Sequence, residues 1–369
     1  SKACTPFGFR KIRDLKVGDI ISSATTGRQQ RIIWLHPIEE HDYYRIHFID
    51  GTHYDCSSGH LWQLHLSRKR TKRKDAEGNV CNERIWSARM IHDWICRKKS
   101  GMYKGMNLII PLCAPVQFTV GNRYKQTKPI EPYVLGALLG DGCITRSVIE
   151  ANAVQLTTMD DEIVQKFMQY GYDMGHSQAK AGSRAKSYMI YNQALVEALC
   201  NLKLSGCDSS NKFIPDQYKL ATIEERKRLI QGIMDTDGYV DERGHISYCT
   251  TSRRLADDVA FIIRSLGGIA TVKRNPSGYR DRSGCRVKCN DSYDVYIRTR
   301  MNPDLVSLSR KRCRCRHEYN GGVSELGKRI IDAEYIGKRE GRCITVDEPC
   351  GLYITDNFTV THNSYIGSV

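Results

Sequence analysis

The chain has 369 residues, of which 40% are hydrophobic, so it is long enough for two or three domains with apolar cores. No apolar run approaches the roughly 20 residues of a transmembrane helix, and Ser1–Pro6 does not read as a signal peptide. We therefore expect a soluble cytoplasmic protein without a membrane partner. The formal net charge of +15 favours a polyanionic partner such as nucleic acid.

The 15 cysteines do not show the paired C-x-x-C spacing of a zinc site. A disulfide framework is not expected in a large chain of this kind. We expect most of the cysteines to be buried, reduced thiols.

The first part of the chain, residues 1–118, is predicted to be an all-β domain. Residues 8–62 contain short runs of β-branched and aromatic residues separated by polar turns, and Asp50-Gly51 is a hairpin signal. We interpret residues 65–110 as a basic insertion, with the run Arg68–Lys74 followed by a helix over 88–95. This run favours nucleic-acid contact over a solvated loop. Polar residues and prolines over 119–131 indicate a linker.

The middle of the chain has a mixed α and β texture. Short strands alternate with helical patterns at 132–140, 160–171, 192–200, 222–235 and 253–266. A second basic stretch, Lys273–Arg286, has the composition of a long hairpin loop. Strand signals return over 330–363. The order is therefore β, an α/β body over 132–305, and β again.

Two apolar helices in the α/β body share one design. Each has small residues four positions apart, and they end in Asp141-Gly142 and Asp237-Gly238. Small residues at this spacing allow two helix backbones to pack closely. Such packing would bring Asp141 and Asp237 together at helix ends that already carry partial negative charge. A divalent cation is the natural compensation for this charge.

This repeat resembles the LAGLIDADG homing endonucleases over roughly 130–300, although the first motif has Leu139-Gly140 where the family often has an acidic residue and alanine. Lys212 matches the family's lysine before the second motif helix. The resemblance implies an αββαββα repeat whose two aspartates bind Mg²⁺ for cleavage of double-stranded DNA. It identifies Asp141, Asp237 and Lys212 as catalytic residues, with the two aspartates as metal ligands.

Near the C-terminus, Thr361-His362-Asn363-Ser364 has the groups needed to cut a peptide bond without a protease. The Asn363 side-chain amide can attack its own backbone carbonyl, close a succinimide and expel the next residue. His362 can donate a proton to the leaving amine, and the Ser364 hydroxyl can carry an acyl group.

An endonuclease-like body inside a β domain with this ending resembles an intein, a self-splicing protein element. Thr5-Pro6-Phe7-Gly8 and the following residues to Asp19 look like the first splicing block. Asp55–His60 looks like the second block, in which Ser57 and His60 would activate the N-terminal scissile amide. The resemblance implies a horseshoe-shaped, Hint-like splicing domain split by the endonuclease domain.

The nucleophile that ordinary inteins carry at their start has no fitting residue here. Instead, Trp62 follows the second block, Cys343 stands where ordinary inteins usually have Asp, and Thr361 precedes His362. This Trp-Cys-Thr set resembles the class-three inteins, in which the internal cysteine replaces the missing nucleophile. It implies attack by the Cys343 thiolate, transfer of the acyl group to Ser364 and cyclisation of Asn363, without a cofactor.

The expected C-terminal junction is Asn363/Ser364, which leaves 364–369 as host sequence. Lys2/Ala3 is the preferred N-terminal junction, because joining gives Lys-Ser followed by an apolar run, as at the end of a phosphate-binding loop. The host would then be a P-loop ATPase such as a phage terminase or helicase. A junction before Cys4 or a start at Ser1 remains open.

Three alternatives also remain. The chain could be an ordinary intein that begins at Cys4, a DNA endonuclease on a splicing-dead scaffold, or a hedgehog-like domain that cleaves without ligating. Ser364 after Asn363 disfavours the last of these. We expect a monomer that acts on its host flanks in cis.

Overall fold

The computed structural model describes residues 1–68, 83–103, 105–119, 128–175, 177–179, 182, 184–276, 278–280, 285–288, 290–315 and 326–363. The chain forms two compact units. The first consists of Ser1–Thr119, Arg264–Ile269 and Tyr319–Val369, and the second of Val120–Ile263 and Ala270–Glu318.

The first unit is built mainly from strands. In chain order these are β1 (Lys2–Thr5), β2 (Gly8–Lys11), β3 (Ile20–Ser22), β4 (Gln29–Leu35), β5 (Glu39–Phe48), β6 (His53–Ser57), β7 (Leu61–Arg68), β8 (Glu83–Ser87), β9 (Met106–Pro111), β20 (Gly327–Gly341), β21 (Ile344–Val346), β22 (Leu352–Thr355) and β23 (Thr359–His362). The helical segments are η1 (Ile12–Asp14), α1 (Ala88–Lys99) and η3 (Asp356–Phe358).

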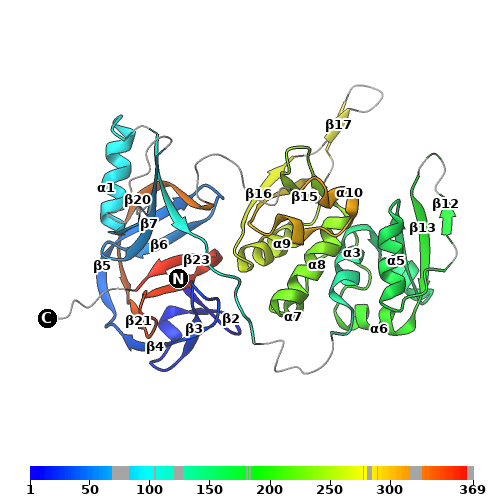
Figure 1. Ribbon diagram of the computed structural model, residues 1–369, viewed down its shortest axis with the longest axis horizontal. Coiled ribbons are helices and arrows are strands. Elements are labelled where there is room, and N and C mark those ends of the chain that lie inside the picture. The colour runs from blue at the N-terminus through cyan, green and yellow to red at the C-terminus, as the bar shows by residue number, and fades with distance from the viewer. Residues whose placement is uncertain are drawn as a thin grey trace. The chain divides into compact units, whose positions relative to one another are not determined.

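Strands from both ends of the chain interleave in this unit, as the blue and red ribbons of Figure 1 show. The large sheet has the order β2-β1-β22-β23-β7-β9-β20-β5-β6, with β8 paired to β7, and a smaller sheet has the order β21-β4-β3. A buried cluster joins the two ends: Ala3, Ile12, Leu15, Ile21, Ile32, Ile344, Val346 and Tyr353. Early and late segments therefore share one core.

The region expected to be a basic insertion differs from that expectation. Its described residues supply β8, β9 and α1, and β9 lies between β7 and β20 in the large sheet. The apolar run Leu108–Ile110 is buried there, which explains why it forms a central strand. The helix predicted over 88–95 is present as α1, so the unit combines strands with this one α-helix among its described residues. Lys69–Asn82, which includes most of the basic run, lies outside the described residues.

The second unit contains two four-stranded sheets and the helices that pack on them. Its helices are α3 (Pro132–Asp141), α4 (Arg146–Glu150), α5 (Asp161–Gln169), α6 (Gln193–Asn201), α7 (Asp216–Lys219), α8 (Ile223–Thr236), α9 (Arg253–Ser265), η2 (Asn302–Leu305) and α10 (Ser309–Arg312). Its strands are β10 (Gly142–Cys143), β11 (Ala153–Thr158), β12 (Ser177–Ala179), β13 (Lys186–Tyr191), β14 (Gly238–Val240), β15 (Ile246–Thr250), β16 (Ile269–Asn275), β17 (Gly278–Arg280), β18 (Arg286–Lys288) and β19 (Ser292–Arg298).

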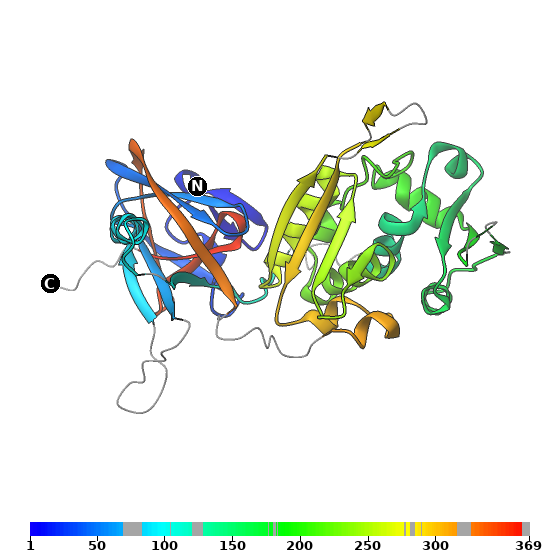
Figure 2. The same cartoon turned by 90° about the horizontal axis from the view of Figure 1, so that it is seen from above.

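The two sheets of the second unit have the orders β10-β11-β13-β12 and β14-β15-β19-β16 (Figure 2). A long helix, α3 or α8, leads directly into the first strand of each sheet. In β15 and β19, inward Tyr248 and Val295 are buried while the outward Tyr296 is exposed. The five helical patterns predicted from the sequence are all helices in the structure.

Within the described parts of the chain, no helix is long and apolar enough to cross a membrane.

Candidate functional sites

The helices α3 and α8 pack against each other through glycines. A Cβ atom on Gly136 would lie 2.1 Å from the Leu229 carbonyl oxygen, and one on Gly232 would lie 2.1 Å from the Tyr133 carbonyl oxygen. Both distances are far below van der Waals contact, so only glycine permits this approach. The close packing that the small residues predicted is therefore present.

Both helices are also fixed at their N-terminal ends. The Glu131 side chain accepts hydrogen bonds from the backbone of Tyr133 and Val134, with Pro132 in the first turn of α3. Thr222 and Glu225 form a capping box at the start of α8. The C-terminal ends, where the two aspartates lie, are therefore held at defined positions.

The carboxyl groups of Asp141 and Asp237 face each other where these helices end. Burial and the neighbouring Asp237 carboxylate raise the pKa of Asp141 to about 7. The pKa of Asp237 is also raised, because protein atoms crowd its carboxylate although part of the residue is exposed to solvent. Asp237 thus makes ionisation of Asp141 more costly, whereas Lys212 and the hydrogen bond with Asp141 favour the ionised form of Asp237.

Lys212 binds the end of α3. Its ammonium group donates to the carbonyl oxygens of Leu138, Gly140 and Gly142 at 3.0, 3.0 and 2.7 Å. Burial lowers the pKa of Lys212, while Asp237 and Asp141 act in the opposite direction. The structure therefore brings together all three residues that the sequence predicted for this site.

A second lysine, which was not predicted from the sequence, binds the end of the other helix. Lys311 donates to the carbonyl oxygens of Met234, Asp235, Thr236 and Gly238 at 2.7, 2.7, 3.2 and 2.7 Å, at the end of α8. Burial, followed by the neighbouring Arg310, lowers the pKa of Lys311 to about 8. A signal was available, since Lys212 follows Gly142 by 70 residues and Lys311 follows Gly238 by 73. However, Lys311 lies in a run of arginines and cysteines whose composition indicates a basic loop.

The paired carboxylates fit a divalent cation. Carboxylate oxygens are the ligands that Mg²⁺ prefers, and a dication would offset both the burial that raises the two pKa values and the repulsion that adds to the rise at Asp141. The described residues contain no group of three or more His, Cys, Asp and Glu that could hold a metal ion. The pair would therefore supply two ligands, and water or phosphate oxygens the others.

A second candidate site lies in the first unit. Ser57, His60 and Cys343 line one pocket together with Ser1, Tyr43 and Arg342. Ser57 ends β6, His60 follows it in a turn, and Cys343 lies between β20 and β21. Segments nearly 300 positions apart thus meet at the three residues assigned to N-terminal activation and attack.

His60 is neutral at physiological pH in this pocket. Burial, and after it the nearby His362, lowers the pKa of His60 to about 4. Its Nε2 atom is buried without a hydrogen-bond partner in the structure. A neutral imidazole with a free nitrogen can bind a peptide group placed in the pocket.

Trp62 and Thr361 do not line the pocket themselves. Trp62 is fully buried, and its ring packs edge-on against that of His60, with ring centroids 5.4 Å apart. Thr361 is fully buried in β23, whose next residue, His362, pairs with Leu61. The Trp62 side chain contacts the Cys56 thiol, and the Thr361 side chain contacts the Tyr353 hydroxyl. Both residues therefore contact side chains that line the pocket.

The end of β23 holds Asn363 tightly. Its backbone N–H donates to the Gly351 carbonyl oxygen at 2.7 Å. Nδ1 of His362 lies 2.6 Å from the Asn363 carbonyl oxygen, the carbonyl that cyclisation would attack. Donation from this nitrogen would polarise that carbonyl. Ser364 lies outside the described residues.

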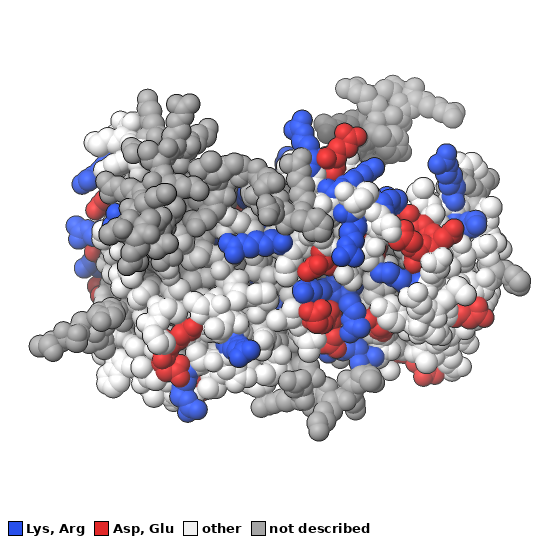
Figure 3. All heavy atoms as spheres, in the orientation of Figure 1, with Lys and Arg blue, Asp and Glu red and all other residues white. Residues whose placement is uncertain are grey.

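The basic segments are only partly described. In Lys273–Arg286, residues 277 and 281–284 lie outside the described residues. On the face shown in Figure 3, basic side chains of the second unit are interspersed with acidic ones. Nucleic-acid contact by either segment stays a prediction.

Comparison with known proteins identifies a LAGLIDADG-like domain over residues 224–301. The chain is 26% identical over 378 residues to the replicative DNA helicase DnaB of Mycobacterium intracellulare, which covers 98% of this chain and 57% of that protein. It is 28% identical over 150 residues to the homothallic switching endonuclease of Saccharomyces cerevisiae, covering 38% of this chain and 25% of the relative. The chain thus spans little more than half the length of the DnaB relative.

Similar solved structures include mesophilic variants of the homing endonuclease I-DmoI, with 16% identity, a TM-score of 0.31, and coverage of 48% of this chain and 93% of that one. The MchDnaB-1 intein is 21% identical with a TM-score of 0.18, covering 24% of this chain and 55% of that one.

Proposed function

We propose that this chain, an intein with a LAGLIDADG-type domain as its insert, excises itself from a host protein and cuts DNA at the site of its own insertion. The observation that carries the splicing function is the meeting of Ser57, His60 and Cys343 in one pocket. The observation that carries the nuclease function is the pair Asp141 and Asp237, with a lysine at each helix end.

Splicing begins with the Cys343 thiolate. Ser57 and His60 bind the N-terminal scissile amide, and Cys343 Sγ attacks its carbonyl carbon. The carbon–nitrogen bond breaks, the amine leaves with a proton, and the upstream flank becomes a thioester on Cys343. The Ser364 hydroxyl then attacks this thioester, which frees the Cys343 thiol and forms an ester.

Release follows at the other end. The Asn363 side-chain nitrogen attacks the Asn363 carbonyl carbon, forming a succinimide as the bond to Ser364 breaks. His362 donates to the carbonyl oxygen through Nδ1, consistent with their separation of 2.6 Å. The freed amine of Ser364 displaces the ester oxygen and forms the peptide bond between the host flanks. No cofactor takes part in these steps.

The pocket favours an element that begins at Ser1, with the N-terminal junction before that residue. Ser1 lines the pocket with Cys343, whereas Ala3 and Cys4 are fully buried in β1 and do not line it. The Ser1 carbonyl oxygen accepts from the backbone of Ile12 at 3.2 Å, and the Ile12 carbonyl oxygen accepts from Arg342 at 3.0 Å. Arg342, the residue before Cys343, is thus linked to Ser1 through Ile12. This geometry disfavours both Lys2/Ala3 and an ordinary intein that begins at Cys4.

DNA cleavage is assigned to the ends of α3 and α8. Asp141 and Asp237 would hold a divalent cation such as Mg²⁺, which, when bound, activates water and stabilises the leaving oxygen of a phosphodiester. Lys212 and Lys311 place positive charge beside the carboxylates and balance the negative ends of both helices. The substrate is double-stranded DNA of the uninterrupted host gene. The DnaB relative suggests a helicase, hence a P-loop ATPase, as the host.

Splicing is tested by expressing the chain with its natural flanks between two unrelated proteins and measuring product masses. We expect a ligated product and a free element whose N-terminal sequence includes Ser1-Lys2. An element that begins at Ala3 or Cys4 would contradict the junction, and an unprocessed fusion would contradict splicing.

Cleavage is tested separately with DNA that carries the uninterrupted site. The protein should cut it only when Mg²⁺ or Mn²⁺ is present. Asp141→Asn and Asp237→Asn should each abolish cutting while splicing continues, because the two sites use different residues. Metal-independent cutting, or full activity in both variants, would overturn the assignment.

A further inference from the structure

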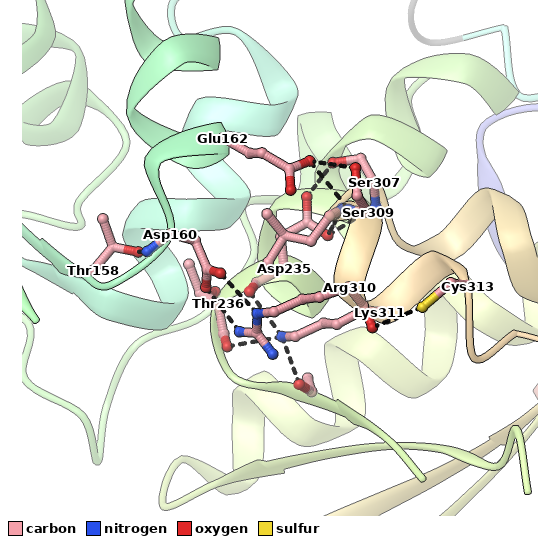
Figure 4. A network of polar contacts seen from close by, with 12 residues as sticks. Thr158, Asp160, Glu162, Asp235, Thr236, Ser307, Ser309, Arg310, Lys311 and Cys313 are labelled. Carbon is pink, nitrogen blue, oxygen red and sulfur yellow. Dashed lines mark hydrogen bonds and ion pairs between the residues drawn. The ribbon is translucent and has the colours of Figure 1, made fainter. Parts of the chain in front are cut away.

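A buried carboxylate next to the proposed nuclease site has no role in the chemistry above. Asp235 lies in the last turn of α8 and is 1% exposed. Its Oδ1 accepts from the backbone N–H groups of Ser307 and Leu308 at 2.8 and 3.1 Å. Its Oδ2 accepts from the Ser307 hydroxyl and, at 2.9 Å, from the Tyr133 hydroxyl. Figure 4 shows these contacts between Asp235 and Ser307.

The segment that Asp235 binds also contains Lys311, four residues after Ser307. The short helix α10 (Ser309–Arg312) presents the Lys311 ammonium to the carbonyl oxygens of Asp235 and its neighbours. Asp235 therefore binds the segment through its side chain and receives Lys311 through its backbone. Residues 307–311 are therefore attached to α8 at two points, through the Asp235 side chain and through Lys311 (Figure 4).

Two acidic residues at the start of α5 also bind the segment that contains Lys311. Asp160 binds Arg310 through two hydrogen bonds of 2.7 Å each. The Glu162 carboxylate accepts from the backbone and the hydroxyl of Ser309 at 3.1 and 2.9 Å. Both surround the start of α5. Residues 309–311 are thus held on both sides.

Lys212, at the end of α3, is held in a different way. Leu139 takes the place in α3 that Asp235 takes in α8, two residues before the aspartate of the pair. The segment of Lys212 is instead bound by Asp258 of α9, which accepts from the backbone N–H of Ile214 at 2.9 Å. The Lys212 carbonyl oxygen also accepts from the Ser252 hydroxyl at 2.6 Å.

We propose that Asp235 is a positioning residue for Lys311 and Asp258 a positioning residue for Lys212, so that each lysine is set by its own buried carboxylate. The proposal rests on the nuclease function above. Because the two lysines bind the ends of different helices, each serves the cleavage of one DNA strand. Loss of one carboxylate should then slow one strand selectively.

The test measures the cleavage rate of each strand separately, using the full chain, Mg²⁺ and DNA labelled differently on its two strands. Lys311→Gln and Lys212→Gln first identify the strand that each lysine serves. Asp235→Asn should then slow the Lys311 strand by about ten- to hundredfold, the size of effect expected from misplacing a catalytic group by about 1 Å. Asp258→Asn is the matched variant and should slow the Lys212 strand.

The outcomes separate positioning from general damage. A folding defect slows both strands together, so equal slowing of both strands by Asp235→Asn would overturn the proposal, as would slowing of the same strand by both variants. If Asp235→Asn does not fold, Ser307→Ala decides, because it removes one hydroxyl contact and keeps both backbone bonds. It should slow the Lys311 strand alone. A wild-type protein that cuts neither strand would instead refute the nuclease function.

Discussion

The ionisation of Asp141 shows how a single residue reports on its site. Its raised pKa of about 7 means that the folded protein binds a proton here at a pH where the unfolded chain does not. From about pH 4 to pH 7, this group therefore makes the folded state less stable as pH rises. Lys311, with a pKa of about 8, stays protonated across this window and does not mask the effect.

Asp141→Asn should accordingly raise the melting temperature of the second unit at pH 8 and have little effect at pH 4. Calorimetry of both proteins across this range measures the difference. Mg²⁺ should stabilise the wild type at pH 8 more than the variant, since it replaces the lost proton. Equal melting temperatures at pH 8 would show that the carboxylates do not repel each other.

Gly351 is a second residue whose role follows from local geometry. Its φ of +62° lies in the left-handed region, and a Cβ there would lie 2.2 Å from Oδ1 of Asn363. Gly351→Ala should displace the Asn363 side chain and slow its cyclisation. The thioester on Cys343 should still form, so a branched intermediate should accumulate on denaturing gels. Normal release of the C-terminal flank would contradict this role.

At the scale of elements, the pair α3 and α8 was predictable from sequence because local signals agree. Each helix combines an apolar run, small residues four apart and a terminal Asp-Gly. The contacts through Gly136 and Gly232 follow from that pattern. The aspartate pair could be predicted for the same reason, whereas Lys212 was predicted only from the resemblance to the endonuclease family.

Other features could not be predicted from the sequence because they depend on contacts with residues far away in the chain. Residues 106–111 form a central strand only by pairing with β7 and β20, and β20 lies more than 200 residues away. Lys311 sits in a segment whose composition indicates a solvated basic loop, yet carbonyl groups of α8 surround its ammonium. Tertiary contacts decide both cases.

Gly232→Val tests the helix contact. The added side chain cannot fit beside the Tyr133 carbonyl oxygen, so the second unit should lose stability and DNA cutting together. Glu224→Val is the control, because it adds the same residue to α8 where the native side chain is 74% exposed. Thermal melting and cleavage assays should separate the two variants. Similar behaviour of both would mean that helix propensity, and not the close approach, is the cause.

At the scale of the whole molecule, the net charge of +15 predicts DNA binding that weakens with salt. Neutralising several charges in Arg68–Lys74 or Lys273–Arg286 should weaken binding and flatten the dependence of the logarithm of affinity on the logarithm of salt concentration. Each lost phosphate contact should lower the slope by about 0.9. Asp141→Asn should leave the slope unchanged. An unaltered slope in the neutralised variants would make these segments solvated loops.

The central claim for the whole molecule is that Cys343, and not a residue at its start, carries the upstream flank during splicing. Thiol-induced release of that flank from the full fusion protein tests it most directly, with Cys343→Ala and Cys4→Ala compared side by side. Cys343→Ala should abolish release by dithiothreitol, because no thioester forms. Cys4→Ala should release the flank almost normally, because Cys4 is buried in β1 away from the pocket. Loss of release in Cys4→Ala with normal release in Cys343→Ala would contradict the account.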